Sequence, residues 1–134
     1  MDWFDQVDEL WRARGSVGEF DSAEEFRALL HVLIGHGNYE VVFDDSSRVC
    51  GFVSWLWVDD LSLDLLNAFG GWRNVYQLAI PLYGGRNLFV MHFISSRTAV
   101  YLRLAKRVLS RVEAGGRIAS FGRFSSDFLV RVKR

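Results

Sequence analysis

Cysteine and proline are almost absent from this sequence, which contains one of each in 134 residues. A single cysteine, Cys50, excludes an intrachain disulfide and leaves a structural zinc site without enough sulfur ligands. Because Cys50 lies in an apolar run, we expect a buried and unreactive thiol. The scarcity of proline and an apolar content of 50% argue against long disordered stretches.

The sequence also has little that would direct it to a membrane. Its N-terminus is acidic and shows no basic region leading into an apolar signal core. The longest apolar run, residues 49–58, is far too short to span a bilayer. We therefore expect a soluble, cytoplasmic protein without membrane contact, in which residues 1–134 form a single domain around one core.

Net charge is zero overall but is distributed unevenly. Residues 1–64 contain fourteen acidic and four basic residues, whereas residues 97–134 contain ten basic and two acidic residues. The two halves either neutralise each other side by side or leave one positive surface. A positive surface would suit an anionic cofactor, a nucleic acid or an acidic protein.

Two amphipathic helices are predicted before residue 38. The first begins at Asp2 and ends near Gly15, and the second begins at the capping box of Ser22 and Glu25 and ends at residues 35–37. Both carry apolar residues at helical spacing on one face. These are Trp3, Phe4, Val7, Leu10 and Trp11 in the first helix, and Phe26, Leu29, Leu30, Leu33 and Ile34 in the second.

The pattern then becomes extended. Residues 39–43 and 49–58 predict a β-hairpin, in which Gly51 marks a bulge or a close backbone approach. After Asp59 and Asp60, a short helix is expected to turn Leu61, Leu65, Leu66 and Phe69 inward. Four further strands are predicted at residues 74–83, 86–94, 117–124 and 128–133, giving a sheet of about six strands.

The segment from Arg86 to Val112 organises this pattern. A strand that is apolar on both faces leads through hydroxyl residues, which suit a helix start, into a long helix. The start of a helix offers free backbone N–H groups and partial positive charge, which favour an anion. We expect the buried stripe of this helix to be Tyr101, Leu102, Ala105, Val108, Leu109 and Val112.

The order of these elements resembles that of the GNAT acyltransferase superfamily. The likeness is carried by the hairpin of residues 39–43 and 49–55 and by the strand-to-helix unit of residues 88–112. It implies a mixed, mostly antiparallel α/β sheet flanked by helices. The segment Gly51-Phe52-Val53-Ser54-Trp55 also looks like a strand of the RTX-toxin-activating lysine acyltransferases, a branch that uses acyl carrier protein as donor. Small GNAT-like proteins are frequent in bacteriophage genomes, and the size of this chain fits that setting.

The resemblance implies acetyl-CoA or another acyl-CoA as cofactor, and a small-molecule or protein amine as acceptor. Ser95, Ser96, Arg97 and Thr98 occupy the place of the loop that holds the coenzyme A pyrophosphate in the superfamily. That loop is rich in glycine elsewhere, and this segment has none. In the toxin-activating branch a histidine before the second helix and an aspartate on the central strand act in catalysis. This chain has no histidine before Ser22, and His92 stands near the place of the aspartate.

His92 is the candidate catalytic residue, as a general base near the acceptor amine. The alternative is a sheet histidine whose ring nitrogens are satisfied by neighbours. His31 and His36 have no partner at metal-ligand spacing, so no metal site is expected. The pairs Asp44-Asp45 and Asp59-Asp60 are interpreted as turn and cap residues rather than acid–base pairs.

Basic residues follow the long helix away from its apolar stripe, at Arg97, Arg103, Lys106, Arg107 and Arg111. They would meet the 3′-phosphate of coenzyme A, contact an acidic protein partner, or form a solvated face. No nucleic-acid motif accompanies them, so a nucleic acid is not expected. The surplus of aromatic residues is compatible with a homo-oligomer.

Two functions remain open at this point. One is an acyl-CoA-dependent acyltransferase that positions an amine against a thioester. The other is a catalytically silent GNAT-like domain that binds a protein or serves a structural role. The missing glycines favour the second, whereas the strand-to-helix unit favours the first.

Overall fold

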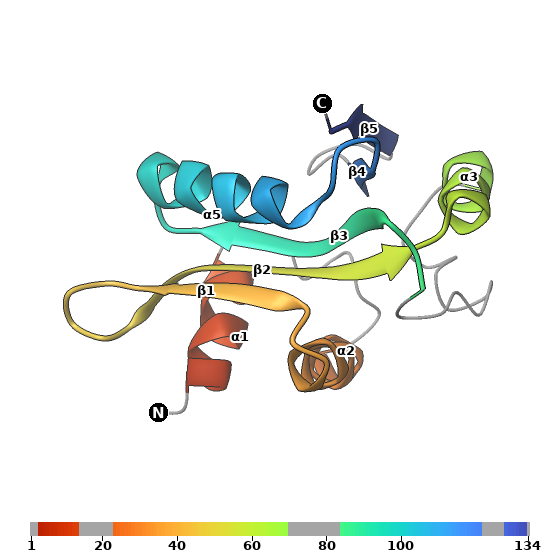
Figure 1. Cartoon of the computed structure of the whole chain (residues 1–134). Coiled ribbons are helices and arrows are strands. Elements are labelled where there is room, and N and C mark those ends of the chain that lie inside the picture. The colour runs from red at the N-terminus through yellow and green to blue at the C-terminus, as the bar shows by residue number, and fades with distance from the viewer. Residues whose placement is uncertain (1–2, 14–22, 70–83, 122–127, 134) are drawn as a thin grey trace. The chain divides into compact units, whose positions relative to one another are not determined.

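The computed structural model describes residues 3–13, 23–69, 84–121 and 128–133. Helices and strands follow one another along these segments as in Figure 1, and each predicted element within them is present. The helices are α1 (Trp3–Ala13), α2 (Ala23–Gly35), α3 (Asp60–Phe69) and α5 (Thr98–Arg111). The strands are β1 (Tyr39–Phe43), β2 (Val49–Val58), β3 (Asn87–Ser95), β4 (Arg117–Phe121) and β5 (Phe128–Val132).

The strands form one five-stranded sheet in the order β1-β2-β3-β4-β5. β1 and β2 pair antiparallel, as do β4 and β5. β3 and β4 pair in parallel, with Leu88 opposite Ile118 and Phe89 opposite Ala119. The fold is therefore α/β with a mixed sheet flanked by helices. The described residues contain five strands, whereas about six were predicted. The predicted strand at residues 74–83 lies outside the described residues.

Contacts divide the chain into two compact units. The first unit contains Met1–Ser54 and His92–Val108, and the second contains Trp55–Met91 and Leu109–Arg134. The boundary crosses β2, β3 and α5, so each unit takes part of each of these elements. The candidate cofactor-binding residues and His92 all belong to the first unit.

Within the first unit, helices cover both faces of the strands. His92 contacts Trp11 of α1, with ring centroids 5.2 Å apart. The next residue along β3, Phe93, lies against Tyr101 of α5 at 4.7 Å. Because successive side chains of a strand point to opposite faces, α1 and α5 lie on opposite sides of the strands. α2 lies on the same side as α1 (Figure 1).

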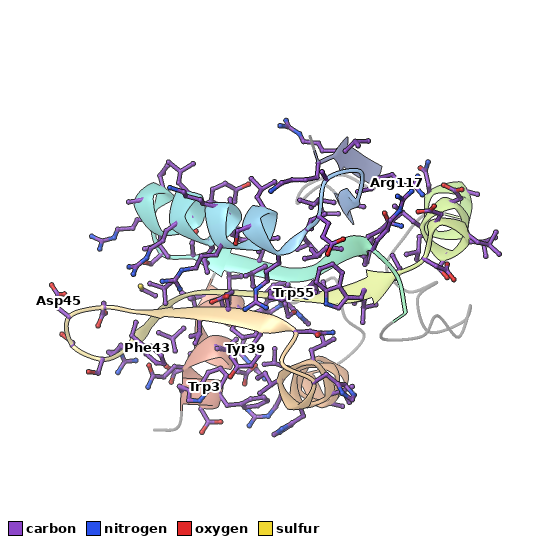
Figure 2. The ribbon with its side chains drawn as sticks, in the orientation of Figure 1. Trp3, Tyr39, Phe43, Asp45, Trp55 and Arg117 are labelled. Atoms are coloured by element: carbon purple, nitrogen blue, oxygen red, sulfur yellow. The ribbon has the colours of Figure 1, made fainter. Side chains whose placement is uncertain are left out.

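The predicted apolar stripe of α1 faces the strands of this unit. Phe4, Val7 and Trp11 are buried. Trp3 stacks on Tyr39 of β1 with ring centroids 5.6 Å apart, as Figure 2 shows. The stripe prediction is confirmed for these residues.

α2 buries Leu30 and Leu33, and it ends at Gly35 as expected. Other predictions for α1 and α2 concern residues or side chains that are not described, namely Gly15, Ser22, Glu25, Phe26 and Leu29.

A hydrogen bond ties α1 to β2 in the same unit. The backbone N–H of Val49 donates to Oε1 of Gln6 at 2.7 Å, and Val49 is buried. A Gln6→Met variant keeps the volume but removes the acceptor, so the N–H of Val49 loses its partner. We expect a loss of about 1 kcal/mol in the free energy of unfolding, measured by urea denaturation. Gln6→Glu keeps an acceptor oxygen at the same place and should stay closer to the parent. Equal stability of all three proteins would contradict the role of this bond.

The buried stripe of α5 differs from the predicted one. The buried residues are Val100, Leu104 and Val108, followed by Val112, whereas Tyr101, Leu102 and Leu109 are 49%, 61% and 45% exposed. The prediction was correct for Val108 and Val112 and wrong for Tyr101, Leu102 and Leu109.

Gly51 of β2 explains why a different stripe of α5 is buried, because the absence of a side chain there lets α5 pack closely on β2. A Cβ atom at Gly51 would overlap Cγ1 of Val100 and lie 2.9 Å from Cδ1 of Leu104. The predicted close backbone approach at Gly51 is thus confirmed. It turns Val100 and Leu104 toward the strands and leaves Tyr101 and Leu102 at the surface. The hairpin also has an irregular register, which lies at Val42/Phe43.

In the second unit, Asp59 and Asp60 fix the start of α3. The Asp59 carboxylate accepts the backbone N–H of Ser62 at 2.7 Å, as an N-cap does. This orientation buries Leu63 and Leu66 and leaves Leu61 69% exposed. The expectation that Leu61 points inward was therefore wrong, and the side chain of Phe69 is not among those described.

Arg117 links α3 to the start of β4 in this unit (Figure 2). Its guanidinium lies 3.1 Å from the Asp64 carboxylate, and its backbone N–H donates to Oδ1 of Asn87 at 3.0 Å. The Asn87 side-chain amide donates to Asp60 at 2.8 Å. These contacts hold together the beginnings of α3, β3 and β4. The charged residues of this region therefore have a structural role.

Candidate functional site

The four predicted cofactor-binding residues lie together where β3 passes into α5. Ser95 ends β3 and is half-buried, whereas Ser96, Arg97 and Thr98 are exposed. α5 begins at Thr98 and has no acidic residue in its first turn. An anion at this helix start would therefore meet a guanidinium, hydroxyl groups and the positive end of the helix dipole, with no nearby carboxylate on the same turn to oppose it.

Part of the backbone between β3 and α5 already forms hydrogen bonds within the protein. The N–H of Ser96 donates to the carbonyl of Cys50 at 2.8 Å, and the carbonyl of Arg97 accepts the N–H of Tyr101 at 3.1 Å. The Ser96 N–H is thus not offered to a ligand. An anion would depend on the N–H groups of the first helical turn, which have no partner within a helix, and on the Arg97 side chain.

His92 is enclosed by protein rather than by a surface cleft. It is 1% exposed, and its Nδ1 atom is hydrogen-bonded to the hydroxyl of Ser54 on β2. The edge of the Trp11 ring packs against it. Burial lowers the pKa of His92 from its usual 6.5 to about 3, so the ring is neutral near pH 7.

This environment weighs against the general-base hypothesis. A base must come within hydrogen-bond reach of the proton that it removes, and a buried ring with a lowered pKa is also a weak base. The alternative interpretation, in which neighbours satisfy the ring nitrogens, is supported for Nδ1 through its hydrogen bond with Ser54. Sequence reasoning did not single out Ser54, although it lies in the Gly51–Trp55 segment that resembles the toxin-activating enzymes.

The other two histidines occupy different environments. His31 is exposed and stacks on Phe4 with ring centroids 4.2 Å apart, and His36 is exposed after the end of α2. Among the described residues, no group of three or more His, Cys, Asp and Glu side chains could hold a metal ion. Cys50 is buried as expected, and its Sγ lies 3.4 Å from the carbonyl oxygen of Val42.

The paired aspartates serve turns and caps, as interpreted from the sequence. Asp44 accepts the backbone N–H groups of Ser46 and Arg48 within the hairpin loop, at 2.8 and 3.0 Å. Hydrogen bonds from Ser62 lower the pKa of Asp59, the N-cap of α3. Hydrogen bonds from Asn87 and Arg86 lower the pKa of Asp60. Asp59 and Asp60 are thus stabilised in their charged forms.

The five basic residues predicted along α5 fall into two groups. Arg107 lies 3.6 Å from the carboxylate of Glu40 in the first unit, and Arg111 lies over the ring of Trp55 in the second. Arg97, Arg103 and Lys106 are exposed, and no carboxylate of the described residues forms an ion pair with them. Only these three are available to an external anion.

Comparison of the chain with protein-family models, with curated proteins and with solved structures found no match in any of the three. A search for helices long and apolar enough to cross a membrane found none within residues 3–13, 23–69, 84–121 and 128–133.

Proposed function

We propose that this chain is an acyl-CoA-dependent acyltransferase that transfers an acyl group to an amine. One observation carries the proposal: exposed Ser96 and Arg97 lead into α5, which begins at the exposed Thr98 and has no acid in its first turn. This segment lies in the connection from β3 to the parallel strand β4. Such a helix start suits the phosphates of a nucleotide-bearing donor such as acetyl-CoA or a longer acyl-CoA.

The proposed chemistry is mainly positioning. The donor would be held through its phosphates, and the acceptor amine would be brought against the thioester carbonyl. The amine nitrogen then forms a bond to the acyl carbon, the bond from carbon to sulfur breaks, and coenzyme A leaves as the thiol. His92 as base stays a hypothesis that requires its ring to become accessible; unchanged transfer by a His92→Ala variant would remove it from the mechanism.

The proposal also implies further features of the fold. A GNAT-like arrangement would contain a sixth strand at residues 74–83 and a sheet with mostly antiparallel pairs. A cytoplasmic, phage-encoded protein would fit the small size of the chain, and a small-molecule or protein amine would be the acceptor. The antiparallel pairs β1/β2 and β4/β5 support this arrangement.

Arg97→Ala should weaken acetyl-CoA binding about tenfold, because a charge-assisted contact to a phosphate is lost. Isothermal titration calorimetry measures the dissociation constant directly. Arg103→Ala is the matched control, since it removes the same charge from the same helix more than one turn beyond its start. Equal weakening by both substitutions would indicate a general charge effect and would contradict a donor site at residues 95–98.

A catalytically silent GNAT-like domain that binds a protein or has a structural role is the second candidate. The burial of His92 and the absence of glycine from residues 95–98 favour it. The two candidates differ in one measurable property, because a silent domain without a donor site would give no heat with any acyl-CoA.

A further inference from the structure

The outer surface of α5 in the first unit combines exposed apolar side chains with positive charge. Leu102 is 61% exposed and Tyr101 is 49% exposed, although both are large apolar residues. Tyr101 is held by the ring of Phe93, at 4.7 Å, so it is fixed rather than folded away. An ordered aromatic ring beside an exposed leucine is typical of the anchor of a protein interface.

Positive charge surrounds this apolar pair. Arg97, Arg103 and Lys106 are exposed, and α5 contains no acidic residue. Arg103 and Lys106 stand three residues apart, a spacing at which like charges on a helix repel each other. Among the described residues, no carboxylate pairs with either of them, so both cations are open to a partner's carboxylates there.

We propose that this surface, made by Arg97, Tyr101, Leu102, Arg103 and Lys106 and called the α5 face below, is a docking site for an acidic amphipathic helix of a partner protein. The apolar face of such a helix would cover Leu102 and Tyr101, and its carboxylates would meet the three cations. The mode is helix-to-helix recognition, in which apolar anchors give affinity and the flanking charges give orientation.

Charge complementarity decides the chemistry of the occupant. A nucleic acid would use the cations, but its phosphate backbone makes no use of an exposed leucine, because such interfaces are markedly polar. A second copy of this chain is a weaker match than such a helix, because four acids of the first unit already form ion pairs within it. Arg27 pairs with Asp5 and Asp8, Arg48 with Glu9, and Arg107 with Glu40.

The α5 face shares Arg97 with the proposed donor site, so a defined probe tests the inference through variants of Leu102 and Lys106, which leave the donor site intact. The probe is a fluorescein-labelled synthetic helix of about 20 residues, with leucines at heptad spacing and glutamates elsewhere. Fluorescence anisotropy at about 150 mM salt is expected to give a dissociation constant of roughly tens of micromolar with the full chain. Leu102→Ser and Lys106→Glu should each weaken binding about tenfold.

β5 offers matched controls for both substitutions. Arg131 and Val132 are exposed there, and Val132 is 60% exposed, close to the value for Leu102. Arg131→Glu and Val132→Ser therefore impose the same changes of charge and apolar surface away from α5, and we expect them to bind the probe as the parent does. Circular dichroism confirms that each variant is folded.

Three results would overturn the inference. The first is absence of probe binding. The second is an equal loss of probe binding in the α5 and β5 variants, which would show that binding does not depend on the α5 face. The third is tighter binding of a DNA duplex or of anionic lipid vesicles than of the probe, lost in Lys106→Glu but unchanged in Leu102→Ser. Loss in both α5 variants, with both β5 controls intact, supports it.

Discussion

Replacing Gly51 by alanine is expected to lower the free energy of unfolding by about 2 to 3 kcal/mol. The added Cβ would overlap Cγ1 of Val100 and lie 2.9 Å from Cδ1 of Leu104, in the contact between β2 and α5. Both partners are buried, so neither can turn away into solvent. The helix must shift, or the side chains must leave their preferred rotamers.

Urea denaturation of two further variants separates this clash from a general effect of alanine. At Gly35 a Cβ would meet nothing within 4 Å, so Gly35→Ala should stay within about 0.5 kcal/mol of the parent. The double variant Gly51→Ala with Val100→Ala should lose less stability than the sum of the single changes, because the truncated residue makes room. Additive losses, or a Gly51→Ala protein as stable as the parent, would show that α5 does not pack on Gly51.

Acidification from pH 7 to pH 5 is expected to cost about 2 kcal/mol of stability through His92. The pKa of His92 is lowered to about 3 in the folded chain, whereas an unfolded histidine titrates near 6.5. Below pH 6.5 the unfolded state therefore binds a proton that the folded state does not. Stability is fully present above pH 6.5 and falls by about 1.4 kcal/mol per pH unit as the pH decreases toward 3.

The surroundings of His92 explain why the loss is not offset. His92 contacts the Ser54 hydroxyl and the Trp11 ring, and neither carries a charge that would stabilise an imidazolium. Urea denaturation between pH 5 and pH 8 measures the slope. His92→Gln should flatten it relative to its own value at pH 8, whereas His36→Gln, at an exposed site, should leave it unchanged. A slope that persists in His92→Gln would mean that another group is responsible.

Periodicity predicted the elements of this fold better than their orientation. α5 shows why, because it carries two apolar stripes, one through Val100 and Leu104 and the other through Tyr101 and Leu102. Hydropathy fits either stripe, and the close approach at Gly51 selects the one that contains Val100 and Leu104. Only the pairing of α5 with β2 decides between the stripes, and no local pattern contains that pairing.

The candidate site could likewise be predicted only in part. The grouping of Ser95, Ser96, Arg97 and Thr98 follows from their adjacency in sequence, so it could be predicted. The environment of His92 could not, because β3 is apolar on both faces and does not reveal which side chains are covered. Its partner Ser54 lies 38 residues away in the sequence, and the hydrogen bond depends on the register of the sheet.

Titration of the unmodified chain with acetyl-CoA, followed by a longer acyl-CoA, tests the central claim most directly. Calorimetry is expected to show binding in the micromolar range, because the phosphates of either donor would reach the start of α5. Coenzyme A itself should compete, since it carries the same phosphates. Absence of heat with both donors would contradict the acyltransferase proposal and would favour the silent binding domain.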